Sequence, residues 1–346
     1  MRRTTPIALS AAALAGVTVA RRRAAARGVD NPAPEGTAER PPPLVGRERT
    51  VLTDDGVALH VAEHGPEQAA AVVVLAHGYT QASRLWDGLV RELLAARPDV
   101  RVVVYDHRGH GRSGACTQET STLEHLGRDL ATVVEQVSGD APVILGGHSM
   151  GGMTLMALAE QRPDLFDAKV VGAAFLGTSS GGLDAVRWGL PRPVVPLFKK
   201  LLPVVNEKAY QAERKGKARQ QIAWFEAFVN FAAGADPADV QDVLEVQRAC
   251  SAATMHFFLA TFSDHARAAA LEALGHVPAL VVVGAQDRLC PVEHSRAIAA
   301  ALPGSELVVF PGAGHMVHLE RRPEVARHLA VLVDRALASR PTAAAV

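Results

Sequence analysis

Short, fully apolar runs alternate with amphipathic stretches along most of the chain. The apolar runs are rich in β-branched residues, as strands buried on both faces of a sheet are. We expect strands at residues 71–75, 102–105, 143–145, 170–175, 279–283 and 306–310. Helical periodicity predicts helices at residues 83–96, 122–137, 150–161, 292–302 and 323–338. Strand and helix therefore alternate as in βαβ units, which predicts an α/β fold with a mostly parallel central sheet flanked by helices.

Two stretches depart from this alternation. Residues 49–65 alternate apolar and polar positions on both sides of Asp54-Asp55-Gly56, which predicts a β-hairpin with a tight turn. Residues 179–277 contain four closely spaced prolines, then helix-like runs at 219–232 and 239–262. We interpret residues 179–277 as a helical insertion, which we call the insertion.

The insertion divides the predicted core in two. Residues 48–178 and 278–338 are expected to form the core, and residues 1–47 an N-terminal extension. The extension has an apolar run at residues 7–20 between arginine-rich segments, followed by a proline-rich linker. Fourteen helical residues span only about 21 Å, less than the roughly 30 Å hydrocarbon core of a bilayer.

The fate of residues 1–26 therefore stays open between three alternatives. We favour attachment to a membrane, either peripheral or as an anchor. A cleaved secretion signal and an unstructured extension are the other two. The protein is accordingly expected to be membrane-associated, cytoplasmic or exported.

Charge and cysteine content point to no further partner. The chain has 36 lysines and arginines against 36 acidic residues, so it lacks the excess positive charge that would attract nucleic acid. Cys116, Cys250 and Cys290 are widely spaced, without a C-x-x-C pair or a neighbouring set of histidines. We expect free thiols, no metal site and no cofactor.

The strongest chemical signal is GGHSMGG at residues 146–152, between a predicted strand and a predicted helix. Gly147-His148-Ser149-Met150-Gly151 fits G-x-S-x-G, in which the serine occupies a strained strand-to-helix turn. Side chains at the two flanking glycines would collide across such a turn. The sequence therefore predicts Ser149 as a nucleophile.

A serine nucleophile needs a base, and the base needs an acid that fixes its tautomer. Asp287 directly follows the strand at 279–283, and His315 follows the next strand through a glycine-rich loop. Both positions lie past the carboxyl ends of strands, where a parallel sheet gathers functional groups. We expect Asp287 and His315 to complete a triad. The alternatives are His318 for the base and Asp264, Asp184 or Glu293 for the acid.

An oxyanion must also be stabilised by positioned donors. The backbone N–H groups of Met150 and of Tyr79, in the loop His77-Gly78-Tyr79-Thr80, are the predicted donors. We expect His77 and His148 to be structural. The glycine-rich segment 106–113 is interpreted as a turn whose Asp and Arg bind neighbouring loops, rather than as a phosphate site.

From residue 48 to residue 338 the chain resembles the α/β-hydrolase superfamily, in particular bacterial esterases and lipases of the monoacylglycerol-lipase type. The resemblance rests on HGYT, DHRGHGRS, GHSMGG, Asp287 and PGAGHMVHLERRPE, which occur in the family's order. It implies a serine hydrolase in which the insertion forms a lid over the nucleophile. Epoxide hydrolases and haloalkane dehalogenases share the fold but use aspartate as nucleophile, so Ser149 argues against both.

The insertion also holds more than half of the chain's aromatic residues, and we expect some of them to line an apolar acyl pocket. The predicted substrate-binding residues are Trp188, Trp224, Phe225 and Phe228. The leading hypothesis is hydrolysis of a small-molecule ester with an apolar acyl group through an acyl-enzyme. The alternatives are a cofactor-free perhydrolase or haloperoxidase, a carbon–carbon bond hydrolase, and a membrane-tethered ligand-binding module without activity.

Overall fold

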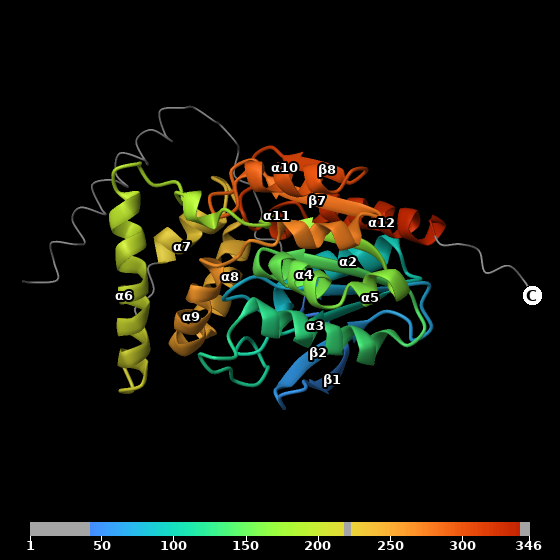
Figure 1. Ribbon diagram of the computed structural model, residues 1–346, viewed down its shortest axis with the longest axis horizontal. Coiled ribbons are helices and arrows are strands. Elements are labelled where there is room, and N and C mark those ends of the chain that lie inside the picture. The colour runs from blue at the N-terminus through green and yellow to red at the C-terminus, as the bar shows by residue number, and fades with distance from the viewer. Residues whose placement is uncertain (1–41, 218–222, 340–346) are drawn as a thin grey trace, which may run out of the picture.

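The structure, a computed structural model, describes residues 42–217 and 223–339 (Figure 1). Eight strands form one sheet in the order β1-β2-β4-β3-β5-β6-β7-β8. The strands are β1 Arg47–Leu52, β2 Ala58–His64, β3 Val72–Ala76, β4 Arg101–Tyr105, β5 Val143–His148, β6 Val170–Leu176, β7 Ala279–Gly284 and β8 Glu306–Phe310. Strands β3 to β8 run parallel to one another, whereas β1 and β2 are antiparallel to their neighbours.

Strands β1 and β2 form the hairpin that the alternating pattern predicts. Gly56 has a φ of 83°, a conformation that glycine adopts without strain, and its N–H donates to the Thr53 carbonyl at 3.0 Å. The Thr53 hydroxyl accepts a hydrogen bond from the Val57 N–H at 2.8 Å. The turn is thus closed by its own residues, so a local pattern was sufficient to predict it.

Helices cover both faces of the sheet, as expected for a parallel sheet whose strands are apolar on both sides. Alternate residues of β3 enter different layers: Val72 and Val74 pack with α3 and α4, and Val73 and Leu75 with α2 and α12. The core helices are η1 Ser83–Trp86, α2 Asp87–Ala96, α3 Leu123–Ser138, α4 Met150–Gln161, α5 Pro163–Ala168, η4 Ala268–Leu274, α10 Val292–Ala301, α11 Val317–Glu320 and α12 Arg322–Ala338. The predicted fold class, a mostly parallel sheet flanked by helices, is confirmed.

The chain between β6 and β7 contains no strand in its described part and is largely helical. Its elements before η4 are η2 Leu183–Ala185, α6 Val195–Glu213, α7 Ala223–Asn230, α8 Pro237–Ala249, α9 Ala252–Leu259 and η3 Ala260–Phe262. Figure 1 shows α6 to α9 gathered at one end of the molecule, with α6 outermost.

Two features of this region differ from the sequence analysis. The run at 239–262, expected as one helix, is divided near Ser251, whose hydroxyl caps α9 by accepting from the Thr254 N–H at 3.0 Å. Helix α6 was not predicted, because its sequence includes Pro196 and Pro203. Pro196 lies in the first turn, where a proline removes no helical hydrogen bond. The helix continues through Pro203.

The predicted apolar segment at residues 7–20 lies outside the described residues. Among the helices of residues 42–217 and 223–339, none is both long enough and apolar enough to cross a bilayer.

Candidate active site

Ser149 lies at the sharp turn between β5 and α4, with φ 53° and ψ −116°. This positive φ is unusual for a residue with a side chain. The neighbouring glycines are required by space: a Cβ on Gly147 would approach the Gly151 carbonyl carbon to 2.4 Å, and one on Gly151 would approach the Ala76 carbonyl oxygen to 2.0 Å. The local sequence therefore determines a turn that raises the serine above the carboxyl edge of the sheet.

Two hydrogen bonds hold the strained residue from the side of β6. The Ser149 N–H donates to the Leu176 carbonyl at 3.0 Å. The Thr178 hydroxyl donates to the Ser149 carbonyl at 2.7 Å. Both groups of the Ser149 backbone are thus occupied, and the side chain is the part of the residue left to react.

Asp287 and His315 are brought together past the ends of β7 and β8. His315 Nδ1 lies 2.8 Å from Asp287 Oδ2, and both side chains are buried. Asp287 Oδ1 accepts from the backbone N–H groups of Leu289 and Cys290, at 2.8 Å each. Because the carboxylate can only accept, Nδ1 carries the proton, and Nε2 is left to act as a base.

The alternative residues from the sequence lie elsewhere. His318 is buried between Trp86 and His148, with ring centroids 4.5 Å and 4.4 Å away, and burial lowers its pKa well below the ordinary histidine value. Asp264 borders a different surface hollow, and the Glu293 side chain is exposed. Asp184 lines the same cavity as Ser149, but Asp287 is the acid bound to His315.

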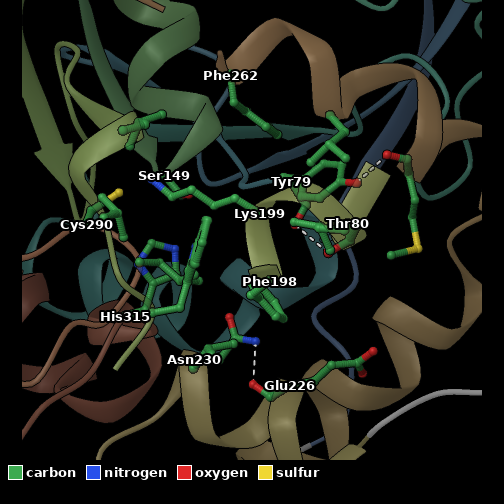
Figure 2. A pocket seen from close by; sticks show the side chains of 18 of the residues that line it. Tyr79, Thr80, Ser149, Phe198, Lys199, Glu226, Asn230, Phe262, Cys290 and His315 are labelled. Carbon is green, nitrogen blue, oxygen red and sulfur yellow. Dashed lines mark hydrogen bonds between the residues drawn. The ribbon is translucent and has the colours of Figure 1, made fainter. Parts of the chain in front are cut away.

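Ser149 and His315 open into one cavity of about 480 Å³ (Figure 2). Within the described chain, no hydrogen bond joins the Ser149 hydroxyl to His315. Most of the cavity wall is apolar and comes from the insertion. Its apolar lining includes Met153, Leu183, Val186, Trp188, Phe198, Leu202, Phe225, Val229, Met255, Leu259, Phe262 and Leu289.

Two of the four predicted substrate-binding residues line the cavity and two do not. Trp188 and Phe225 line the cavity, as expected. Trp224 and Phe228 do not, which corrects the sequence-based prediction. Trp224 is 45% exposed, and the Phe228 ring packs under the Arg288 guanidinium, 4.2 Å from its centroid. Adjacent residues of a helix point roughly 100° apart, so Phe225 can line the cavity while Trp224, whose ring centroid is 5.7 Å from that of Phe225, remains exposed.

The loop expected to supply an oxyanion donor is rigidly held. Tyr79 and Thr80 line the cavity, and the Tyr79 hydroxyl donates to the Met255 carbonyl at 2.5 Å. The Thr80 N–H donates to His110 Nε2 at 3.2 Å. Met150, the other predicted donor, is the first residue of α4, where backbone N–H groups have no partner within the helix.

His77 and His148 occupy buried structural positions. His77 Nδ1 donates to the Gly78 carbonyl at 2.7 Å, and its Nε2 accepts from the His107 N–H at 3.0 Å. His148 Nε2 donates to the His315 carbonyl at 2.9 Å. Burial lowers the pKa of both rings below the ordinary histidine value. The described residues contain no cluster of three or more potential metal ligands.

The segment 106–113 also acts through hydrogen bonds and ion pairs. Asp106 accepts from the Ser83 and Arg112 N–H groups at 2.7 and 2.9 Å. The buried Arg108 guanidinium binds Asp129 and Asp55 at 2.6 and 2.7 Å. The segment therefore connects the turn before β2, the start of η1 and α3.

Several functional-site residues were not found by sequence reasoning. Cys290 borders the cavity, three residues after Asp287. All three cysteines are free thiols. Arg288 and Glu320, which contact the insertion, were not predicted either, because a single charged residue gives no sign of a partner far away in the sequence.

Comparisons with known proteins agree with this geometry. Residues 67–322 match the family profile Hydrolase_4, described as serine aminopeptidase, S33. A monoacylglycerol lipase of Mycolicibacterium smegmatis is 30% identical over 72% of this chain and 82% of its own length.

Solved structures show the same fold. An esterase of Thermogutta terrifontis has a TM-score of 0.65 and 20% identity, covering 84% of this chain and 99% of its own. A bromoperoxidase of Bacillus anthracis has a TM-score of 0.65 and 21% identity, over 83% and 100%. At such identities the structures establish the fold alone. Because the profile covers most of the chain, the protein belongs to the Hydrolase_4 (serine aminopeptidase, S33) family and is an α/β-hydrolase enzyme similar to esterases and lipases.

Proposed function

We propose that the protein hydrolyses carboxylic esters with an apolar acyl group through an acyl-enzyme on Ser149. The observation that carries this proposal is that Ser149 and His315 face one cavity with a largely apolar wall (Figure 2). An acyl chain buried against this wall would leave its ester carbonyl at the serine. The related monoacylglycerol lipase supports an acyl ester as the substrate class.

In the proposed reaction, His315 Nε2 accepts the proton of Ser149 as Oγ attacks the ester carbonyl carbon. Asp287 stabilises the imidazolium, and the N–H groups of Tyr79 and Met150 donate to the oxyanion. Collapse of the tetrahedral intermediate breaks the C–O bond to the alcohol, which takes the proton from His315. Water then attacks the acyl-enzyme by the same route, releasing the acid and restoring the serine.

A series of p-nitrophenyl esters, from acetate to dodecanoate, tests this proposal. We expect kcat/KM to rise with chain length until the cavity is filled, and an acid-quenched sample to carry one acyl adduct on Ser149. Ser149→Ala should lose both signals. Folded wild-type protein that hydrolyses no ester of the series would contradict the proposal. Peroxide-dependent halogenation faster than ester cleavage would favour the perhydrolase alternative.

We also propose that the segment at residues 7–20 attaches the protein to a membrane surface. Its apolar run between arginines supports such attachment. N-terminal sequencing of the protein from separated membrane and soluble fractions tests this. An intact N-terminus in the membrane fraction is expected, and a chain beginning after residue 20 in the soluble fraction would contradict it.

A further inference from the structure

Helix α7 of the insertion is capped by the residue that follows the catalytic acid. The last carbonyls of a helix have no partner within the helix. Here Arg288, next to Asp287, donates from one guanidinium nitrogen to the carbonyls of Phe228 at 2.7 Å and Phe231 at 2.8 Å. A cation at this end of a helix is also favoured by the helix dipole. The acid loop is thus tied to the end of α7.

The histidine loop is tied to the same short segment. The Met316 N–H donates to the carbonyl of Asn230, the last residue of α7, at 3.0 Å. One oxygen of the Glu320 carboxylate accepts from the Ala232 N–H at 3.0 Å, and the other from the Gly314 N–H at 2.9 Å. Gly314 and Met316 flank the proposed base directly. Glu320 therefore links the backbone beside the base to the backbone just after α7.

These hydrogen bonds surround a direct contact between two backbones. A Cβ on Gly314 would approach the Ala232 nitrogen to 2.5 Å and the Phe231 carbonyl carbon to 2.6 Å. Only a glycine, which carries a hydrogen atom in place of a side chain, lets the backbone at Gly314 approach the backbone at 231–232 this closely. We call the contact of residues 228–232 with Arg288, Gly314, Met316 and Glu320 the α7 joint.

The two charged residues of the joint are partly withdrawn from water. Burial raises the pKa of the Glu320 carboxyl, and the N–H groups of Ala232 and Gly314 oppose this rise. Burial lowers the pKa of the Arg288 guanidinium, and the charges of Glu320 and Asp287 oppose that shift. Burying charged groups is unfavourable unless they are bound. A residue that only capped α7 could remain in water, so the burial of Arg288 and Glu320 favours a further role for both.

We propose that Arg288 and Glu320 are positioning residues, through which the end of α7 holds the Asp287 and His315 loops in the geometry for proton transfer. The packing of the insertion on the core and the alignment of His315 are then coupled, because Arg288 and Glu320 determine both. This inference rests on the function proposed above, in which His315 is the base. It predicts that loosening the joint slows catalysis even for a substrate too short to contact the aromatic wall.

Glu320→Gln loosens the joint with little change of volume. An amide presents one acceptor oxygen, so one of the two backbone N–H groups would face the amide NH₂ and lose its partner. We expect kcat for p-nitrophenyl acetate to fall between about tenfold and a hundredfold with KM nearly unchanged, because a small displacement of a catalytic group has effects of this size. A residue that only stabilised the insertion would instead raise KM for long-chain esters.

Asp239→Asn is the matched control. Asp239 is a buried carboxylate in α8 that pairs with Arg322 of α12, and burial raises its pKa as it does for Glu320. The pair joins the insertion to the core, and neither side chain forms a hydrogen bond with Asp287, His315 or Glu320 in the described part of the chain. We expect Asp239→Asn to lower the free energy of unfolding while leaving kcat for p-nitrophenyl acetate within about twofold of the wild type.

Arg288→Gln provides a second, independent variant, since its half-buried side chain tolerates replacement more readily. It should also lower kcat for the acetate ester, and the double variant should lose less than the product of the single effects, because both residues hold one segment. If the wild type is active and Glu320→Gln and Arg288→Gln have the same kcat as the Asp239→Asn control, this inference is wrong and the proposed function is unaffected. Wild-type protein without esterase activity would overturn the proposed function instead.

Discussion

The carboxyl edge of the sheet and the insertion contribute to one cavity in different ways. At the sheet edge, Ser149, Asp287 and His315 are held by buried backbone hydrogen bonds in short loops. The insertion contributes amphipathic helices whose aromatic rings divide between the cavity and solvent. The positions of Ser149, Asp287 and His315 therefore depend on local backbone geometry, whereas the cavity wall depends on how whole helices rotate and pack.

The largest effect is expected from changing the acid at the sheet edge. Asp287→Asn keeps the side-chain volume but favours the wrong tautomer of His315, so kcat should fall by about 10⁴-fold with little loss of stability. Steady-state kinetics together with urea unfolding measure both quantities. Asp264→Asn, a change of the same kind in the insertion, should leave kcat unchanged. Equal kcat values for Asp287→Asn and Asp264→Asn would contradict the assignment of the acid to the sheet edge.

A second prediction concerns the backbone of the nucleophile turn. Gly151→Ala places a methyl group 2.0 Å from the Ala76 carbonyl oxygen, so β3 or α4 must shift. We expect the free energy of unfolding in urea to fall by about 3 kcal/mol. Gly275→Ala is the control, since its nearest new contact, the Glu272 carbonyl oxygen, is 3.2 Å away. Similar losses in both variants would show that the turn is not specially constrained.

The pH dependence of stability should follow the buried histidines beneath the sheet edge. Burial lowers the pKa of His110 to about 3, and its Nε2 accepts the Thr80 N–H. Since the folded-state pKa lies below the unfolded value of about 6.5, its contribution to stability is complete above pH 6.5 and is lost as the pH falls towards 3. Each pH unit in this window should remove up to about 1.4 kcal/mol for this residue.

Thermal unfolding between pH 7.5 and pH 4.5 checks this expectation. His110→Gln should be less stable than the wild type at pH 7.5 but lose less stability on acidification. A wild-type curve and a variant curve that remain parallel would show that His110 does not titrate in this window.

The smallest effect is expected in the insertion. Trp188→Ala removes part of the apolar wall, so KM for p-nitrophenyl dodecanoate should rise about tenfold while the acetate ester is unaffected, which corresponds to about 1.4 kcal/mol of binding. Trp224→Ala removes the same side chain from an exposed position outside the cavity and should change neither ester. A rise in KM for Trp224→Ala would instead place that residue on the substrate path.

The sequence could predict the sheet and the approach of Asp287 to His315 for a physical reason. Apolar β-branched runs predict strands, and Gly147 and Gly151 are where the tight turn around Ser149 leaves no room for a side chain. The wall of the cavity could not be predicted in the same way. Trp224 and Phe225 are adjacent aromatic residues in the same predicted helix, yet only Phe225 lines the cavity. The rotation of α7 about its axis decides this, and tertiary contacts set that rotation.

The α7 joint shows the same limit. Arg288 and Glu320 lie close to Asp287 and His315 in the sequence, but their partners at 228–232 are about sixty to ninety residues away. The sequence does not predict helix α6, because prolines usually mark irregular chain, although Pro196 is compatible with a first turn. Tertiary packing decides which residues far apart in the sequence bind each other and where a helix forms despite its prolines. A single sequence gives no local pattern for either.

Reaction with a fluorophosphonate probe tests the central claim most directly, because the probe phosphonylates a serine only when a base activates it. We expect one adduct per chain on the peptide containing Ser149, none in Ser149→Ala, and strongly slowed labelling in Asp287→Asn. A folded wild-type protein that remains unlabelled, or an adduct that persists in Ser149→Ala, would contradict the account.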